Sequence, residues 1–178
     1  MTDLPPPDAY DRIADHFAAT RERPWPEVES FVADRARTAV EDASGADEGA
    51  VALDVGCGNG RHAALLAPVA DRVVGLDAST ALLDVARRRA ADRGYPLDPV
   101  CGDAAALPLA DDAVAVALYV ATVHHLRPRA RRVASLDELG RVLAPGGVAL
   151  VSAWSVAHDR FDADAGFDTT VDWTLPDG

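Results

Sequence analysis

The sequence predicts an α/β fold with a doubly wound, Rossmann-like and mostly parallel sheet, in one domain that spans residues 1–178. From residue 50 onward, apolar runs of strand length alternate with segments of helical period. This alternation implies a parallel sheet that helices cover on both faces. A turn with three glycines, Gly56, Gly58 and Gly60, follows the first apolar run. Glycine lets the backbone turn with positive φ and lets a ligand approach the main chain, so the turn indicates a ligand site.

The residues before the core predict a helical cap over residues 8–43. Apolar side chains recur at helical spacing in residues 8–20, namely at Tyr10, Ile13, Ala14 and Phe17. Pro24 and Pro26 end this helix, because each proline pushes the preceding residue out of the α region. A second helix is expected over residues 27–43, and a polar joint with a glycine, residues 44–49, leads into the first strand.

The core is expected over residues 50–154. Five strands are predicted, at residues 50–54, 72–77, 98–101, 114–120 and 148–154. Helices are predicted between them, at residues 60–67, 80–93 and 128–143. Ser79 is a candidate N-cap of the middle helix, and Gly94 ends it. Residues 155–178 are acidic and weakly patterned, so we expect a tail or loop that folds onto the body or onto a partner.

The spacing of the glycine turn distinguishes between ligands. Its order is G-x-G-x-G, and Asp54 stands two residues before the first glycine. The dinucleotide fingerprint is instead G-x-G-x-x-G, beside a pyrophosphate that a carboxylate would repel. A cationic ligand suits Asp54 better. S-adenosylmethionine fits, because it carries an ammonium and a sulfonium group and no phosphate.

Two further acidic residues follow strands of the predicted sheet. Asp77 ends the second strand about twenty residues after the glycine turn, where a carboxylate can accept hydrogen bonds from ribose hydroxyls. The alternative is that Asp77 is only the neighbour of a helix cap. Asp103, with the small Ala104 after it, follows the third strand and can receive the amino group of an adenine ring.

The fourth strand ends at Val120 and leads to His124 and His125. A histidine at this edge can orient an acceptor, bind an anion or take a proton, which favours His124 as a residue that contacts substrate. For His125, the alternative to a functional role is that its side chain only caps the next helix. A metal site is not expected, since two adjacent histidines on a strand end should point apart.

Arg21 and Trp25 precede the core in an arginine-rich, proline-rich segment. Arginine can hold a carboxylate through two N–H groups, and tryptophan can cover an adenine or a uracil. The alternative is a hydrophobic plug with a surface arginine.

The amino-acid composition indicates the environment in which the protein is expected to work. The net charge is −12, and all 17 basic residues are arginine, as expected in a salt-rich cytoplasm, where salt screens self-repulsion. No long apolar run or signal peptide is present, so a cytoplasmic location is expected. Cys57 and Cys101 are too few for a zinc site and are interpreted as small buried residues.

Several motifs together resemble the class I S-adenosylmethionine-dependent methyltransferases that act on carboxymethylated wobble uridine in tRNA. The similarity covers about residues 8–157. It comprises Tyr10 to Phe17, T-R-x-x-P-W-P at 20–26, D-V-G-C-G-N-G at 54–60, G-D-A at 102–104, H-H-L at 124–126, R-R at 131–132, E-L at 138–139, R-V-L at 141–143, P-G-G at 145–147 and S-A-W at 152–154. The T-R-x-x-P-W-P element and the double histidine narrow the resemblance to this family.

The resemblance implies methyl transfer to the carboxylate of 5-carboxymethyluridine in the anticodon loop, giving a methyl ester. Arg21 and His124 are then the candidate catalytic residues, and both would anchor the acceptor. The resemblance also implies a heterodimer with a small zinc-binding activator of methyltransferases, paired along a sheet edge, so that any zinc belongs to the partner. The resemblance also implies a final β-hairpin after the fifth strand, which is not expected in this sequence up to Gly178. Either the chain is then a truncated form, or the open sheet edge is covered in another way.

RNA binding by so acidic a surface would depend on the activator or on a local cluster of arginines. The alternative for the cluster is a solvated helix face. Its members are Arg127, Arg129, Arg131 and Arg132.

Two other functions stay open, a methyltransferase for a small molecule such as a quinone and a cofactor-binding scaffold without activity. A nicotinamide-dependent oxidoreductase would need the other glycine spacing. The candidate cofactor-binding residues are Arg21, Trp25, Asp54, Gly56, Gly58, Asn59, Gly60, Asp77, Ala78, Asp103, Ala104 and Val120.

Overall fold

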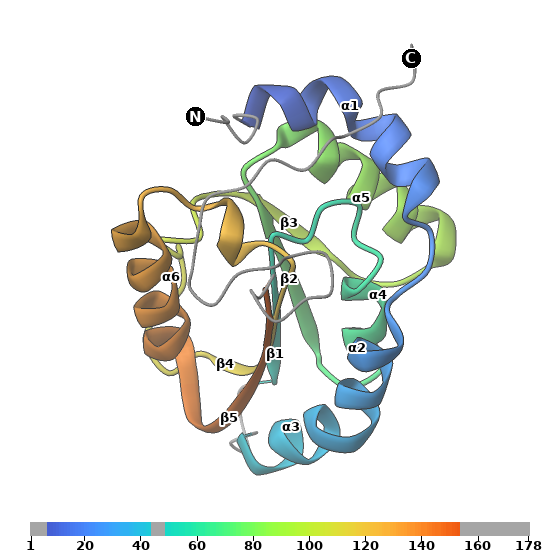
Figure 1. The fold of residues 1–178 in the computed structure, drawn as a ribbon. Helices are drawn as coiled ribbons and strands as arrows, with labels where there is room; N and C mark the ends of the chain where they lie inside the picture. The colour runs from blue at the N-terminus through green and yellow to red at the C-terminus, as the bar shows by residue number, and fades with distance from the viewer. Residues whose placement is uncertain (1–6, 44–48, 154–178) are drawn as a thin grey trace.

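The computed structural model describes residues 7–43 and 49–153 and contains one five-stranded sheet with the order β3-β2-β1-β4-β5 (Figure 1). All four strand pairs are parallel. The strands are β1 (Val51–Val55), β2 (Arg72–Asp77), β3 (Asp98–Cys101), β4 (Val114–Val120) and β5 (Leu143–Ser152). From β1 the chain builds the sheet first toward β3 and then toward β5, so the order reverses between β1 and β4. The expected doubly wound fold is confirmed.

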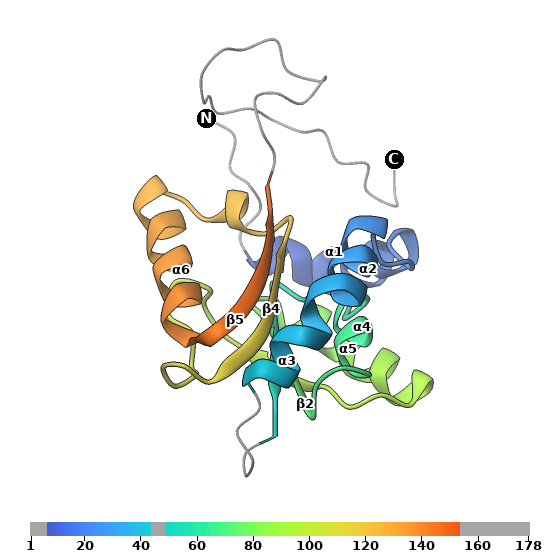
Figure 2. The ribbon, with the colours of Figure 1, turned by 90° about the horizontal axis from the view of Figure 1, so that it is seen from below.

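Helices cover both faces of the sheet. Figure 2 shows α6 on one side and α2 to α5 on the other, while α1 lies across the upper end of the sheet beside α5 (Figure 1). Their bounds are α1 (Pro7–Thr20), α2 (Pro26–Phe31), α3 (Arg37–Ala43), α4 (Ala63–Leu66), α5 (Thr80–Arg93) and α6 (Arg129–Val142). A π-helical segment, Val32–Ala36, joins α2 to α3, so the predicted second helix runs on with a local change of hydrogen bonding.

Each face of the sheet has its own apolar cluster. Along β1, Leu53 and Val55 join the cluster under α6, whereas Ala52 joins the cluster under α2 and α4, as the alternation of side chains on a strand requires. All seven residues of β4 are buried. A strand that is covered on both faces needs a continuous apolar run, and this is the reason that the sequence predicted it so clearly.

Most predicted bounds agree with the structure to within one residue, and two elements differ by more. The bounds of β2, β3 and β4 are confirmed. The helix after the glycine turn is only four residues long, because Gly60 with φ of 72° cannot be helical and residues 61–62 still belong to the turn. The last strand begins at Leu143, five residues early, since Leu143 already has extended backbone and pairs with Val114. Trp154 and residues 155–178 lie outside the described residues.

The two cysteines differ. Cys57 is buried, as expected, but Cys101 is exposed, so that interpretation was wrong for Cys101. The reason is its place at the end of β3, which has a neighbour on one side only among the strands of residues 7–43 and 49–153. No helix within residues 7–43 and 49–153 combines the length and the apolar character needed to cross a membrane.

A buried hydrogen bond between β4 and α6 gives a prediction about stability. The fully buried Tyr119 donates to Ser135 Oγ at 2.9 Å, and Ser135 donates to the Arg132 carbonyl at 2.9 Å. We expect Tyr119→Phe to lower the free energy of unfolding in urea by about 1 kcal/mol. Ser135→Ala should cost more, because it leaves the Tyr119 hydroxyl buried without its acceptor. The double variant should then lose less than the sum, and strict additivity would contradict the coupling.

Candidate functional site

The glycine turn lies at the carboxyl end of the sheet, where the strand order reverses. The N–H groups of Gly56 and Cys57 donate to the Leu76 carbonyl on β2 at 2.7 and 3.0 Å. Gly56 has φ of 70°, and a Cβ there would lie 2.2 Å from Thr122 Oγ1. Both the backbone conformation and the neighbouring threonine therefore require glycine. Ligands of open α/β sheets bind at such a reversal, and the turn is at this place.

Asp77 ends β2, and its two oxygens hold the glycine turn and the next helix. Oδ2 accepts the N–H of Gly58 at 2.8 Å, and Oδ1 accepts the N–H of Ser79 at 2.9 Å. Burial raises the pKa of Asp77, against these backbone hydrogen bonds, which lower it. Asp77 is therefore the neighbour of a helix cap, since Ser79 caps α5. Each carboxylate oxygen still has a further lone pair for a ligand hydroxyl. Ala78, the next residue, is exposed at the same edge.

Asp54 is a buried carboxylate on β1, beneath the turn. It is 2% exposed, and its Oδ2 has no hydrogen-bond partner among the described residues. Burial, with the charge of Asp77, raises the pKa of Asp54 to about 7, and Arg61 opposes the rise. A buried acceptor without a donor is costly. A cationic ligand above the turn would relieve that cost, so the Asp54 carboxylate fits a ligand with an ammonium or sulfonium group.

Asn59 ties the glycine turn to the N-terminal cap. Its Nδ2 donates to the Arg21 carbonyl at 2.9 Å and to the Ala18 carbonyl at 3.5 Å, and its Oδ1 accepts the N–H of Arg61 at 3.3 Å. Asn59 is 1% exposed. Its side chain thus binds the protein, and it brings the end of α1 onto the turn.

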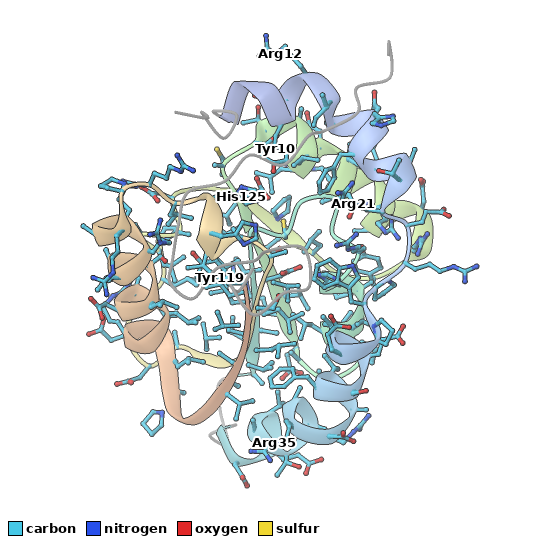
Figure 3. The ribbon with its side chains drawn as sticks, in the orientation of Figure 1. Tyr10, Arg12, Arg21, Arg35, Tyr119 and His125 are labelled. Atoms are coloured by element: carbon cyan, nitrogen blue, oxygen red, sulfur yellow. The ribbon has the colours of Figure 1, made fainter. Side chains whose placement is uncertain are left out.

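Arg21 follows α1 and is half-buried at the upper end of the sheet, the end that also holds Tyr10 and His125 (Figure 3). Its guanidinium lies over the Phe17 ring, 4.5 Å from the centroid, and donates to Thr20 Oγ1 at 3.1 Å. Burial lowers the pKa of Arg21. Phe17 also lies above Gly58, where a Cβ would be 3.4 Å from its ring. The N-terminal cap therefore covers the glycine turn.

Trp25 has a different environment from Arg21. It packs at the border of the apolar cluster under α2 and α4, and its backbone N–H donates to His62 Nε2 at 3.4 Å. The guanidinium of Arg61 lies 5.2 Å from its ring centroid, and the His62 ring meets it edge-on at 5.9 Å. These contacts are those of the plug that the sequence left as an alternative. Among the described residues, Trp25 makes no hydrogen bond or ring contact with Asp77.

Arg61 and His62, the two residues after the turn, are site residues that the sequence did not predict. Both are buried, and Arg61 Nε donates to His62 Nε2 at 3.2 Å. Burial and the Arg61 charge lower the pKa of His62 to about 4, so the ring stays neutral and can accept this bond. Burial lowers the pKa of Arg61 to about 10. The sequence signal that could have identified them is a pair of polar residues, Arg61 and His62, directly before four apolar residues that begin a helix.

The two histidines do not point apart, and that expectation was wrong. They lie in a 3₁₀ turn, Val123–His125, and their ring centroids are 4.3 Å apart. The backbone turns sharply because Ala121 has φ of 51°, so the strand geometry stops before the pair. Tyr10 of α1 reaches His125 Nε2 at 3.4 Å, and burial lowers the pKa of His125 to about 4. Burial also lowers the pKa of His124. Both rings are therefore neutral at pH 7.

Asp103 follows β3 and pairs with α6. Its Oδ1 accepts the N–H of Ala105 at 2.9 Å, and its Oδ2 lies 2.5 Å from Arg131. Burial opposes ionisation, but these two bonds lower the pKa of Asp103. Arg132 donates to the Leu126 carbonyl at 3.1 Å. Two members of the arginine cluster thus serve internal contacts. Ala104 and Val120 are both buried, at the ends of β3 and β4.

Comparison with known proteins assigns the segment that holds these residues. A family described as methyltransferase domain matches residues 52–147. The match begins in β1 and ends inside β5, and it contains the glycine turn, Asp77, Asp103 and the double histidine.

Curated relatives include tRNA (carboxymethyluridine(34)-5-O)-methyltransferases. The enzyme of Mus musculus is 32% identical over 150 residues, which cover 84% of this chain and 20% of that protein. That of Schizosaccharomyces pombe is 31% identical over 171 residues, 93% of this chain and 66% of that protein. This chain thus spans between a fifth and about two thirds of the length of these two relatives.

Solved structures share the fold. The cyclase SpnF superposes with a TM-score of 0.61 at 24% identity, over 80% of this chain and 57% of that one. A putative methyltransferase in complex with the Haloferax volcanii Trm112 activator gives a TM-score of 0.54 at 23% identity, with the same coverage of 80% and 57%.

Asp54 gives a prediction about pH and stability. Its pKa of about 7 in the folded protein exceeds the ordinary value of 3.8, so the folded state holds the proton more tightly than the unfolded state does. The contribution to stability is fully present below about pH 4 and is lost as the pH rises through about 7. Relative to Asp54→Asn, the free energy of unfolding of the wild type should therefore fall by up to about 4 kcal/mol between these values.

The matched control is Asp84→Asn, at an exposed aspartate that pairs with Arg87. Its difference from the wild type should stay flat over the same range in urea unfolding. A difference between Asp54→Asn and the wild type that is constant, or that changes in the opposite direction, would contradict the assignment to Asp54.

Proposed function

The chain belongs to the methyltransferase domain family, and from that premise we propose that it methylates the carboxylate of 5-carboxymethyluridine at the wobble position of tRNA. That it is an S-adenosylmethionine-dependent methyltransferase follows from the family and from its relatives. The names of the relatives, which match 84% or more of this chain, support the acceptor. One observation carries the proposal further. Two motifs of the resemblance, the stretch from Tyr10 to Phe17 and the double histidine, meet at the carboxyl end of the sheet, where the Tyr10 hydroxyl lies 3.4 Å from His125 Nε2.

The carboxylates around the glycine turn fit the cofactor. When bound, S-adenosylmethionine supplies a methyl group on a positively charged sulfur that leaves readily. Asp54 Oδ2, buried and without a donor among the described residues, would face its cationic end. The free lone pairs of Asp77 would accept the ribose hydroxyls, and Asp103 with Ala104 would receive the adenine.

The acceptor needs no general base, because a carboxylate is already ionised at pH 7. The task of the protein is then to align the carboxylate and to exclude water around it. Arg21 would hold the carboxylate through paired N–H groups. His124, neutral because burial lowers its pKa, would orient the uridine by a hydrogen bond without carrying charge. Tyr10 and Phe17, on the cap, would shield the site from water.

Binding of tRNA would involve the end of α6 next to the double histidine. Arg131 and Arg132 make contacts within the protein. Arg129 is exposed at the start of α6 and is the first candidate for a phosphate contact. Because the net charge of −12 repels RNA, binding of phosphates requires a local positive charge such as that of Arg129. It also favours help from a partner.

We propose that the partner is a small activator subunit. The Haloferax volcanii complex pairs the Trm112 methyltransferase activator with a putative methyltransferase of the same fold. In the described part of this chain, β5 pairs with β4 on one side only, and Val151 on β5 is 42% exposed. Strand addition at this edge would pair its backbone groups and cover that apolar surface. Any zinc would be held by the partner.

The reaction is tested with labelled S-adenosylmethionine, the activator and high salt. We expect incorporation into tRNA that carries carboxymethyluridine and none into tRNA without it, with the methyl ester identified by nucleoside mass spectrometry. If both tRNA samples stay unlabelled while a small carboxylate or quinone is methylated, the acceptor is a small molecule. Cofactor binding without any transfer would instead identify a scaffold.

Arg21 gives a second prediction. If it holds the acceptor, Arg21→Ala should reduce kcat/KM for tRNA on the order of 100-fold, the cost of a poorly placed reactant. It should change the Kd for S-adenosylhomocysteine far less in calorimetry. Arg23→Ala, two residues later at an exposed position, is the control and should change neither. Equal losses of transfer and of cofactor binding would contradict the role of Arg21 toward the acceptor.

A further inference from the structure

The strongest unassigned feature is a contact between α1 and the start of α5. The carboxylate of Asp11 on α1 reaches residues 68 and 70 positions later in the chain. Its Oδ1 accepts the hydroxyl of Ser79 at 2.5 Å and the N–H of Ala81 at 3.1 Å. These bonds lower the pKa of Asp11, so the carboxylate is charged at pH 7.

Asp11 completes the N-terminal cap of α5. The first N–H groups of a helix have no partner within it. Ser79 Oγ accepts the N–H of Leu82 at 3.1 Å, the usual bond of an N-cap serine. Asp11 accepts that of Ala81, which Ser79 does not reach. The hydroxyl has a single proton, and its bond to Asp11 turns the serine lone pairs toward Leu82. A charged carboxylate here also interacts favourably with the helix dipole.

Ser79 connects this cap to the candidate ribose site. Its own N–H donates to Asp77 Oδ1 at 2.9 Å, while Gly58 of the glycine turn donates to Asp77 Oδ2 at 2.8 Å. Whatever holds Ser79 therefore orients the Asp77 carboxylate. The path from Asp11 to Asp77 passes through one residue.

The same helix carries the groups that cover the site. Tyr10, next to Asp11, reaches His125 at 3.4 Å, and Phe17 lies above Gly58. The other polar contact between α1 and α5 is weak, because Asp15 and Arg88 are 3.4 Å apart and their side chains are 94% and 64% exposed. Exposed ion pairs of this kind contribute little. Among the described residues, Asp11 thus makes the principal polar contact between α1 and α5.

We propose that Asp11 is a positioning residue that couples the docking of α1 to the binding of the cofactor. With Asp11 in place, Asp77 is oriented toward the ribose and the cap closes over the turn in one arrangement. Because such coupling is reciprocal, a bound cofactor must also hold α1 more firmly. The proposal rests on the cofactor alone and holds for any acceptor, so an inactive enzyme on tRNA would leave it standing.

The test measures binding of S-adenosylhomocysteine to the full chain by calorimetry. Loss of one cap interaction predicts that Asp11→Ala raises Kd roughly five- to tenfold. Asp11→Asn keeps an oxygen acceptor for both donors, and its Kd should stay within about twofold of wild type. Asp15→Ala, one helical turn later, is the matched control and should bind as wild type.

Hydrogen exchange supplies the second readout. In the wild type, S-adenosylhomocysteine should slow amide exchange in α1, and in Asp11→Ala this protection should be lost. Wild-type affinity in Asp11→Ala, or an Asp15→Ala variant that loses as much, would overturn the proposal. If Asp11→Ala does not fold, the wild type still decides, since α1 amides that exchange equally fast with and without S-adenosylhomocysteine exclude the coupling.

Discussion

The site depends on one carboxylate that holds two backbone segments. Asp77 accepts the N–H of Gly58 from the turn after β1 and the N–H of Ser79 before α5. It thereby sets the distance between the glycine turn and the end of β2, the two places where a nucleoside can lie in an open α/β sheet. Burial raises the pKa of Asp77, so these hydrogen bonds are also what keeps its charge tolerable.

The N-terminal cap is the second half of the site and is held by residues of the core. Asn59 binds the main chain at Arg21, and the start of α5 binds Asp11. Both anchors stand beside the proposed cofactor, one within the glycine turn and the other next to Asp77. Binding of the cofactor and closure of the cap are therefore expected to support each other. This differs from a lid that is attached only by a flexible hinge.

Burial sets the charge state of the site, which contains neutral histidines and two neighbouring buried carboxyl groups. Burial, together with repulsion by Asp77, raises the pKa of Asp54 to about 7, and a cationic ligand would remove that penalty. On the acceptor side, burial lowers the pKa of His125 to about 4. Neutral rings would suit the proposed anionic acceptor, because its methylation needs alignment and no base.

The sequence by itself determined the sheet and the place of the site. β4 was predictable because a strand buried on both faces must be apolar at every position, and the turn because Gly56, Gly58 and Gly60 directly follow an apolar run. Only the tertiary structure decided which groups meet. Three contacts join residues through space or through an unusual turn: the pairing of Asp11 with Ser79, the packing of Trp25 against His62, and the tilted rings of His124 and His125. The hydrophobic periodicity of a segment shows which of its sides faces the core. Contacts between separate segments depend on how those segments pack, and the local pattern of residues does not determine this packing.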